Sequence, residues 1–483
     1  MNIINLKSRL LRLSLVATLA FVVSGCAMIG PQYKTPETES LLSGGMLISD
    51  YRNTDEVLTE WWDVFEDDRL SKLVDDALEH NRDLHALSAN LRASRANLRL
   101  ARLARLPSDE ISASVSESRQ SAVGLQQQLG ASTTASEQAS AFPDVELYSV
   151  SFAPQWELDL FGRVSRQIQI SKSNYESQLM QLRGLQLMVI GEVTTQYFQL
   201  QSLLSERQTL EGNIGLQTES LRIADALFKY GRGVEVSVFN ARAQLQSSQA
   251  AMPPIDSSIS QIEARLAVLT GRAPGALQQQ LSSRSSATYI TRELPIGELS
   301  ELLRRQPSVR AAEHKLAGSV SEVGLAVSSM FPQVSLVGSI GYSAQQSEQL
   351  FDDNALQFSF GPTLSWSLND LLLGKQRINA AEHRSKAAFA EYEKSILIAL
   401  EDLNTALASQ KASRDRQPLL ESALRDSQEA ARIAKAQYEF GASSLRDLLD
   451  AEQRLLQAEL AARRGVYDIV IAQISVFRSL GAG

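Results

Sequence analysis

The chain carries the same structural unit twice, with the second copy following the first at an almost constant separation. Trp156 and Trp366 lie 210 positions apart, and the glycines at 231 and 441 share this separation. Each copy has the same order: a helix, two segments of alternating polarity, and two very long helical stretches that meet at the glycine. In each copy we expect the first helix to run unbroken to a proline, Pro107 or Pro332. Such a persistent offset marks an internal duplication, so the fold must consist of two similar halves.

The long helical stretches have the spacing of a coiled coil. Apolar or small residues recur at alternating steps of three and four over Leu448–Val476, and the first copy repeats the pattern over Val238–Leu266. This spacing predicts rods that pack side by side, and the many Ala, Ser and Gly residues let helix axes approach closely. A helix from 162 to 228 would be about 100 Å long at ~1.5 Å per residue. Pro253 and Pro254 predict a kink or a broken turn in one rod.

Four segments alternate between apolar and small polar residues, roughly at 109–118, 145–158, 333–342 and 356–368. Each approaches the ~9–11 residues that a tilted strand needs to cross a bilayer. Core strands of a soluble sandwich are the alternative interpretation. A four-stranded sheet with an oily outer face would leave two open edges, which lipid does not permit, so further copies of the chain must complete a barrel. Pro362 fits a strand end or a bulge better than a central position.

The N-terminus reads as a secretory signal, with basic residues followed by the apolar run "LSLVATLAFVV" and then by "VSGC". Cys26 is the only cysteine, and "VSGC" resembles the bacterial lipobox, in which the cysteine is acylated. A small buried residue within the signal is the alternative. Because Ala27 follows rather than Asp, we expect sorting to the outer membrane. The formal net charge of −8 argues against nucleic acid as a partner.

Several long motifs resemble one family. "WWDVFEDDRLSKLVDDALEHNRDL", "LTGRAPGAL" and "YEFGASSLRDLLDAEQRLL" are similar to the TolC-like outer-membrane factors of bacterial tripartite pumps, above all to their lipid-anchored multidrug-efflux branch. The resemblance implies a mainly α-helical fold with β-strands that span the membrane. In this fold three chains give a twelve-stranded barrel and a periplasmic tunnel of antiparallel coiled-coil hairpins. It also implies a homotrimer in outer-membrane lipid, served by a periplasmic adaptor (membrane fusion) protein and an inner-membrane transporter, usually of the proton-driven RND type.

The resemblance and the repeat together predict five segments along the chain. These are a lipoprotein signal peptide (1–25), a lipid-anchored segment (26–66), a first structural repeat (67–271), an equatorial linker (272–297) and a second structural repeat (298–483).

A periplasmic gate is the first functional site that the resemblance implies. Asp447 and Asp450 match the paired aspartates that ring the closed aperture, and Tyr438 matches a tyrosine of the closed contact. The spacing of three puts both carboxylates on one helix face. Six carboxylates in a trimer should raise one another's pKa values and attract cations. A solvated helix start is the alternative, since Asp also suits the N-terminal end of the helix dipole.

The hairpin tips are the second implied site, for contact with the adaptor. In the first copy Ser237 and Asn240 replace the aspartates, so one hairpin per chain brings acids to the aperture. Some relatives lock the gate with an arginine where this chain has Ser443. The residues expected to contact the adaptor are Gly231, Val234, Gly441, Ser444 and Leu445.

No catalytic constellation is visible in the sequence. The four histidines are scattered without metal-ligand spacing, and "GRG" at 231–233 belongs to a hairpin tip. We therefore expect no enzyme, cofactor or metal site, but a passive, gated exit duct for small molecules such as drugs. An exit duct for type I protein secretion is one alternative, and a periplasmic scaffolding or adaptor lipoprotein is another.

Overall fold

The computed structural model describes residues 28–36, 60–119, 144–281 and 305–481 of the chain. These residues form two compact units, each of which combines equivalent parts of both sequence copies. The sheet unit holds the described residues of Met1–Lys34, Ser94–Tyr175 and Lys315–Phe389. The helical unit holds the described residues of Thr35–Ala93, Glu176–His314 and Ala390–Gly483.

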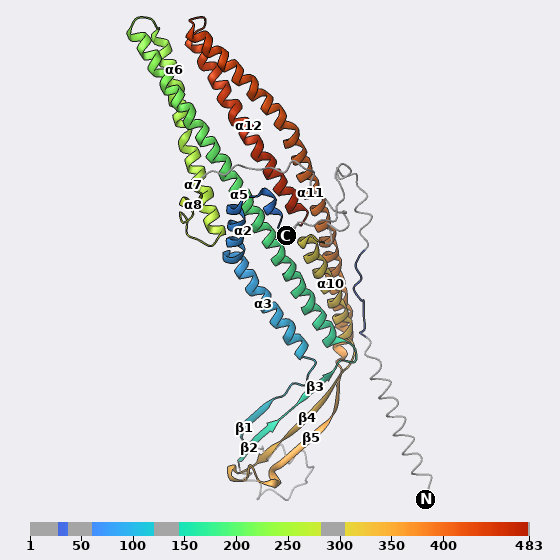
Figure 1. Cartoon of the computed structure of the whole chain (residues 1–483). Coiled ribbons are helices and arrows are strands. Elements are labelled where there is room, and N and C mark those ends of the chain that lie inside the picture. The colour runs from blue at the N-terminus through green and yellow to red at the C-terminus, as the bar shows by residue number, and fades with distance from the viewer. Residues whose placement is uncertain (1–27, 37–59, 120–143, 282–304, 482–483) are drawn as a thin grey trace, which may run out of the picture. The chain divides into compact units, whose positions relative to one another are not determined.

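The strands all belong to the sheet unit and lie side by side in Figure 1. They are β1 (Ile111–Ser118), β2 (Val145–Phe152), β3 (Gln155–Leu158), β4 (Gln333–Ala344) and β5 (Leu356–Ser365), with the short 3-10 helices η4 (Ser347–Gln349) and η5 (Asp353–Ala355) between the last two.

The helices begin with the 3-10 helix η3 (Trp61–Phe65), and four of the later ones contribute residues to both units. They are α2 (Asp68–His80), α3 (Arg82–Leu103), α5 (Arg163–Lys229), α6 (Glu235–Ala250), α7 (Met252–Leu269), α8 (Gln278–Leu281), α10 (Pro307–Ser328), α11 (Leu368–Glu439) and α12 (Leu445–Ser479). None of the helices that the structure describes is apolar over a long enough stretch to cross a membrane.

The sheet is antiparallel throughout. Strand β4 pairs with β2 and then β3 along one edge and with β5 along the other, while β1 pairs with β2. Among the described residues, β1 and β5 therefore each keep one unpaired edge. The segment expected at 145–158 is divided into two strands, because Pro154 has no N–H to continue the ladder.

The last strand is shorter than the sequence predicts. It ends at Ser365, and α11 begins at Leu368, so the expected end at 368 is wrong by three residues. Pro362 lies inside β5 opposite Leu336 rather than at its end. This position tolerates proline because β5 is an edge strand. The proline nitrogen, which has no N–H to donate, can point away from the paired strand β4.

The register separates the two faces of the sheet by polarity. Residues paired across strands share a face, and one set of pairs joins apolar residues: Val115 with Tyr148, Phe152 with Ile340, and Ile340 with Phe358. The alternate set is mostly small and polar. Phe358 is 80% exposed, although it is a large apolar side chain. The sheet therefore presents an oily face that nothing within the described chain covers.

Serine hydroxyls occupy the opposite face. Ser112 and Ser151 lie 2.9 Å apart, and Ser114 and Ser149 lie 2.8 Å apart, in cross-strand hydrogen bonds between β1 and β2. Ser339 pairs with Ser359 in the register of β4 and β5. Alternation along each strand thus gives one face suited to lipid and one suited to water, as the period of two predicts.

Aromatic residues from distant segments form the core of the helical unit. Trp61 stacks on Phe477 with ring centroids 5.1 Å apart, and Phe65 meets Phe198 at 4.9 Å. The Tyr197 hydroxyl donates to a carboxylate oxygen of Asp67 at 2.7 Å. These contacts join η3 to α5 and α12 and account for the buried tryptophans near the start of the described chain.

The first helix is broken in both copies, which corrects the prediction of one continuous helix in each. In the second copy Gln306 is not helical and α10 begins at Pro307, and in the first copy the break lies at Asn81. Asn81 separates α2 from α3 in an extended conformation, and its side chain accepts from the N–H groups of Asp83 and Leu84. The Asn81 amide also donates to the Leu269 carbonyl at 3.0 Å. Gly271 packs so closely against the break that a Cβ there would overlap the carbonyl oxygen of His80.

The prolines in the rods have unequal effects. Helix α6 ends at Ala250 and α7 begins at Met252, so the predicted break before Pro253 and Pro254 is confirmed. By contrast α11 continues through Pro418. Close approach is visible at Gly465 of α12, where a Cβ would overlap the Gln417 side chain of α11.

Candidate functional site

The turns between α5 and α6 and between α11 and α12 share one backbone design. Gly231 and Gly441 have φ values of 73° and 77°, in the left-handed region that favours glycine. At each turn the N–H of the following residue donates to the carbonyl five positions earlier, at 2.9 Å from Arg232 and 2.7 Å from Ala442. This is a Schellman closure, and it explains why glycine stands at both positions.

The second turn continues into a capping box. Ser444 accepts from the N–H of Asp447 at 3.3 Å, while its own N–H donates to the Asp447 carboxylate at 3.1 Å and its hydroxyl donates there at 2.7 Å. These bonds, the hydroxyl one first, hold the pKa of Asp447 below its usual range. Within one chain these bonds therefore lower the pKa of Asp447, whereas the crowding of carboxylates in an assembled ring is expected to raise it.

Asp450 follows one turn later on the exposed side of α12. Its carboxylate lies 4.0 Å from the guanidinium of Arg446, a cation that is not part of the predicted gate. Leu445, Leu448 and Leu449 are buried on the other side of the same helix. The amphipathic start of α12 thus leaves both aspartates facing outward, as their spacing predicts.

Tyr438 packs within the chain rather than standing free. It lies against an apolar cluster that joins all four helices at the two turns, and burial raises its pKa. The cluster also ties Leu445 into the interior, so one expected adaptor-contact residue is buried. Its buried members are Ala224, Val238, Ala241, Leu445, Leu448 and Leu449.

The first turn has different chemistry at the matching positions. Val234 caps α6 without a side-chain hydrogen bond, and Ser237 and Asn240 stand where the second copy has aspartates. Both turns expose an aromatic side chain, Tyr230 in the first and Phe440 in the second. The two turns are therefore alike in shape and unlike in charge.

Two polar features near the second turn were not anticipated from the sequence. A carboxylate oxygen of Glu452 is buried without a hydrogen-bond partner, and burial raises the pKa of this residue despite Lys435 nearby. The side-chain amides of Gln244 and Gln453 form a hydrogen bond between α6 and α12. Glu452, Gln244 and Gln453 all lie within the stretches that have the coiled-coil pattern. A polar residue in such a stretch indicates a possible contact between helices.

Cys26 lies outside the described residues, but the segment that follows it is firmly held. Arg166 of α5 is only 1% exposed and donates to the carbonyls of Ile29 and Gly30 at 3.1 and 3.2 Å. Gly324 of α10 lacks the Cβ that would overlap this guanidinium. The N-terminal segment is thus fixed to the sheet unit shortly after the predicted lipidation site.

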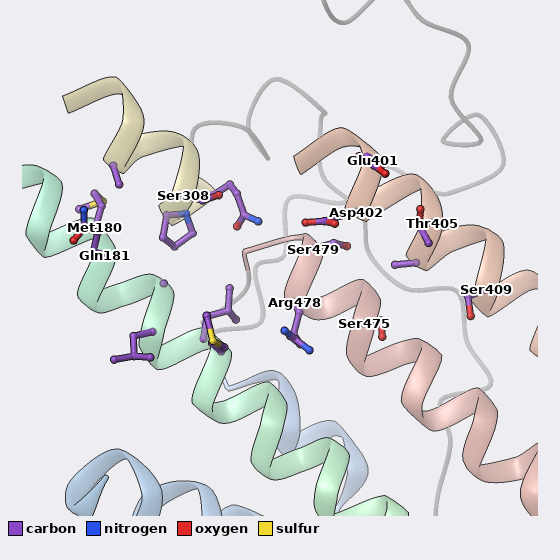
Figure 2. A pocket seen from close by; sticks show the side chains of 18 residues that line it. Met180, Gln181, Ser308, Glu401, Asp402, Thr405, Ser409, Ser475, Arg478 and Ser479 are labelled. Carbon is purple, nitrogen blue, oxygen red and sulfur yellow. The ribbon is translucent and has the colours of Figure 1, made fainter. Parts of the chain in front are cut away.

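The helical unit contains a cavity of about 760 Å³. Figure 2 shows the side chains that line it from α5, α10, α11 and α12. Its polar wall carries Glu401, Asp402 and Arg478. The described residues that line it include neither histidine nor cysteine, and no cluster of metal ligands occurs in the described parts of the chain. None of the predicted gate residues lines this cavity.

Known proteins share this arrangement along nearly the whole chain. The sequence profile of the family described as outer membrane efflux protein matches residues 73–272 and 299–482, which together exceed half of the chain. The chain belongs to the outer membrane efflux protein family. It is 29% identical to outer membrane protein OprJ of Pseudomonas aeruginosa over 470 residues, covering 96% of this chain and 94% of OprJ.

Further relatives agree in sequence and in fold. The toluene efflux pump outer membrane protein TtgI of Pseudomonas putida is 28% identical over 476 residues, which are 96% of each chain. The solved structure of the outer-membrane channel OprN matches with a TM-score of 0.84 at 32% identity, covering 95% of this chain and 99% of that one. The chain is therefore an outer-membrane efflux channel that extends into the periplasm. The fold class inferred from the sequence is confirmed, and a periplasmic scaffold or adaptor is the wrong class.

Proposed function

We propose that three copies of this chain form one exit duct through which small molecules, delivered from an inner-membrane transporter, leave the cell. The sheet carries the proposal, because its oily face is exposed and its outer strands each keep an unpaired edge among the described residues. In lipid an open edge leaves backbone groups unsatisfied, so sister chains must pair with both edges. Three sheets then close into one barrel, with the serine-rich faces lining water.

The closed state of this duct depends on the second turn. Asp447 and Asp450 are exposed on α12, while Tyr438 packs against the apolar cluster that includes the buried leucines of the same helix. A ring of these carboxylates would favour cations and hinder anions. Their mutual repulsion would raise the pKa values, but the bonds from Ser444 oppose this for Asp447 and help keep it ionised.

The turns are also the surfaces that we assign to the periplasmic adaptor. Gly231, Gly441 and Ser444 shape the two ends, and exposed Val234 adds an apolar contact. The transporter is proposed to be a proton-driven pump of the RND type, and TtgI, a relative, is named for a toluene efflux pump. Displacement of the turns by the adaptor would open the ring.

Bilayer conductance tests the gate. The Asp447→Ala/Asp450→Ala variant should conduct more than the wild type and lose most of its preference for K⁺ over Cl⁻, measured as a reversal potential in a salt gradient. The matched control is Ser237→Ala/Asn240→Ala, which changes the same positions of the first copy. Equal conductance and equal ion preference in the double aspartate variant and the wild type would refute the gate.

Acylation of Cys26 is a separate proposal with a separate test. We propose that Cys26 becomes the first residue of the mature chain and carries the lipid, and the firm hold on Ile29 and Gly30 supports a fixed anchor point there. Mass spectrometry of the N-terminal peptide should find the added acyl mass in the wild type and none in Cys26→Ser. An unmodified wild-type peptide that still begins before Cys26 would refute it.

A further inference from the structure

The end of helix α3 carries an unusual surface next to the sheet. Arg99 and Arg102 are exposed, lie on one helix face, and have no carboxylate partner among the described residues. Arg105 follows and is also exposed, with a single hydrogen bond to the Ser165 hydroxyl at 3.1 Å. Leu103 and Leu106, which directly follow Arg102 and Arg105, are 56% and 59% exposed. Cations and large apolar groups thus alternate along this segment, and none of the three arginines has a carboxylate partner in the described parts of the chain.

A tryptophan joins this surface to the oily face of the sheet. Trp156 pairs with Leu336 in the register of β3 and β4, which places it on the apolar face. Its indole N–H donates to the Arg105 carbonyl at 2.9 Å. The basic helix end and the membrane-facing side chains are therefore contiguous within the sheet unit, and the contact is direct.

The second copy repeats the tryptophan but not the series of three arginines. Trp366 donates to the Met330 carbonyl at 3.0 Å, in the same way that Trp156 binds Arg105. There, however, Arg377 is paired with Asp370 at 2.9 Å, and the other exposed side chains nearby include leucines and a single lysine, Lys375. Tryptophan at both places fits the boundary of a bilayer, where one end of the ring is apolar and the other is wet.

We propose that Arg99, Arg102 and Arg105, with Leu103, Leu106 and Trp156, form a binding surface for anionic phospholipid headgroups at the periplasmic surface of the outer membrane. The leucines reach the acyl boundary while the long arginine side chains extend toward phosphate oxygens. Guanidinium groups suit this chemistry because they bind phosphate with two parallel hydrogen bonds. The inference goes beyond the proposed gate, since it depends only on the sheet spanning the membrane.

The test compares the lipids that remain bound to the purified full-length channel. The protein is reconstituted in phosphatidylcholine with a minority of phosphatidylglycerol, and the retained lipids are counted by native mass spectrometry. The attraction of the three arginines for anionic headgroups, weakened by salt screening, gives an expected phosphatidylglycerol enrichment of about tenfold over the bulk ratio. Arg99→Gln/Arg102→Gln/Arg105→Gln should bring the ratio close to bulk, and the triple Lys replacement should retain most of the enrichment.

The control removes three equally exposed cations elsewhere, as Lys411→Gln/Arg425→Gln/Arg454→Gln, and should leave the enrichment unchanged. Equal enrichment in the wild type and the Arg99/Arg102/Arg105 variant would overturn the proposal. A second measurement tests whether this helix face is accessible in the assembly. In a Cys26→Ser background, the thiol of Arg99→Cys should react with a bulky maleimide in the detergent-solubilised protein. Protection of that thiol would show that a sister subunit covers the helix face, which would also overturn the proposal.

Discussion

The first and the second helical hairpins have the same turn geometry but differ in how their helices begin and pack. Both turns close on a left-handed glycine, at 231 and 441. After the first turn the helix starts at an uncapped Val234 and breaks at Ala251, whereas after the second turn a capping box starts a helix of 35 residues. Duplication has therefore preserved the backbone turn while the chemistry around it diverged. The difference places the exposed aspartates, the capping box and the longer unbroken outgoing helix in the second hairpin of each chain.

Close packing gives the largest expected difference between the hairpins. Gly465 of α12 corresponds to Ile255 of α7 at the separation of 210, and Ile255 is buried. Gly465→Ile should destabilise the protein by about 2–3 kcal/mol, because the added side chain overlaps Gln417 and Leu420. The measurement is the thermal midpoint of the helical circular dichroism signal.

Two further variants calibrate that result. Ile255→Ala should cost a similar ~3 kcal/mol for the opposite reason, since it leaves a cavity. Gly465→Ala should cost less than Gly465→Ile, because the Gln417 side chain can move aside. If Gly465→Ile left the midpoint unchanged, α11 and α12 would not be as close as described.

Capping gives the next effect. Ser444→Ala removes the box at the start of α12 and should lower stability by about 1 kcal/mol. The reciprocal change, Val234→Ser, supplies a cap that α6 lacks and should raise stability by a few tenths of a kcal/mol to ~1 kcal/mol. Local hydrogen exchange at the first turn of each helix reports these effects directly. If exchange were faster in Val234→Ser, or if it were not faster in Ser444→Ala than in the wild type, the caps would not limit the opening of these helices.

The pH dependence of the second turn is the smallest predicted effect. Because the pKa of Asp447 is lowered in the folded chain, its contribution is complete above the ordinary carboxyl value of ~4 and is lost as the pH falls through the lowered value. Hydrogen exchange at the start of α12 should therefore accelerate on acidification relative to the start of α6, where Ser237 does not titrate. Asp447→Asn should remove this difference between the hairpins, and its persistence in that variant would assign it to another group.

The sequence was most informative where one periodicity extended over many residues. Alternation located the strands that the structure describes, and the offset of 210 predicted that the two glycine turns correspond. Steps of three and four located the rods, because an amphipathic stripe buries only one face. These patterns depend on a repeated local rule, so single exceptions do not hide them.

Features set by contacts between distant residues were missed. The break at Asn81 depends on the Leu269 carbonyl and on Gly271, far along the chain. The division at Pro154 and the tolerance of Pro362 depend on how each proline is placed relative to the paired strands. At the candidate gate, the spacing of Asp447 and Asp450 predicted their shared exposure, but Arg446 and the bonds from Ser444 change their electrostatics.

The central claim is that sister chains complete the sheet at its two open edges, β1 and β5. Cys26 is the only native cysteine, so cysteine pairs can be read cleanly in a Cys26→Ser background. Ser114→Cys on β1 is combined in turn with Gln357→Cys, Ser359→Cys or Gly361→Cys on β5, and the membrane-embedded protein is oxidised. At least one pair should yield disulfide-linked dimers and a linked trimer, with neither single cysteine giving the trimer. Unlinked single chains for all three pairs would contradict the account.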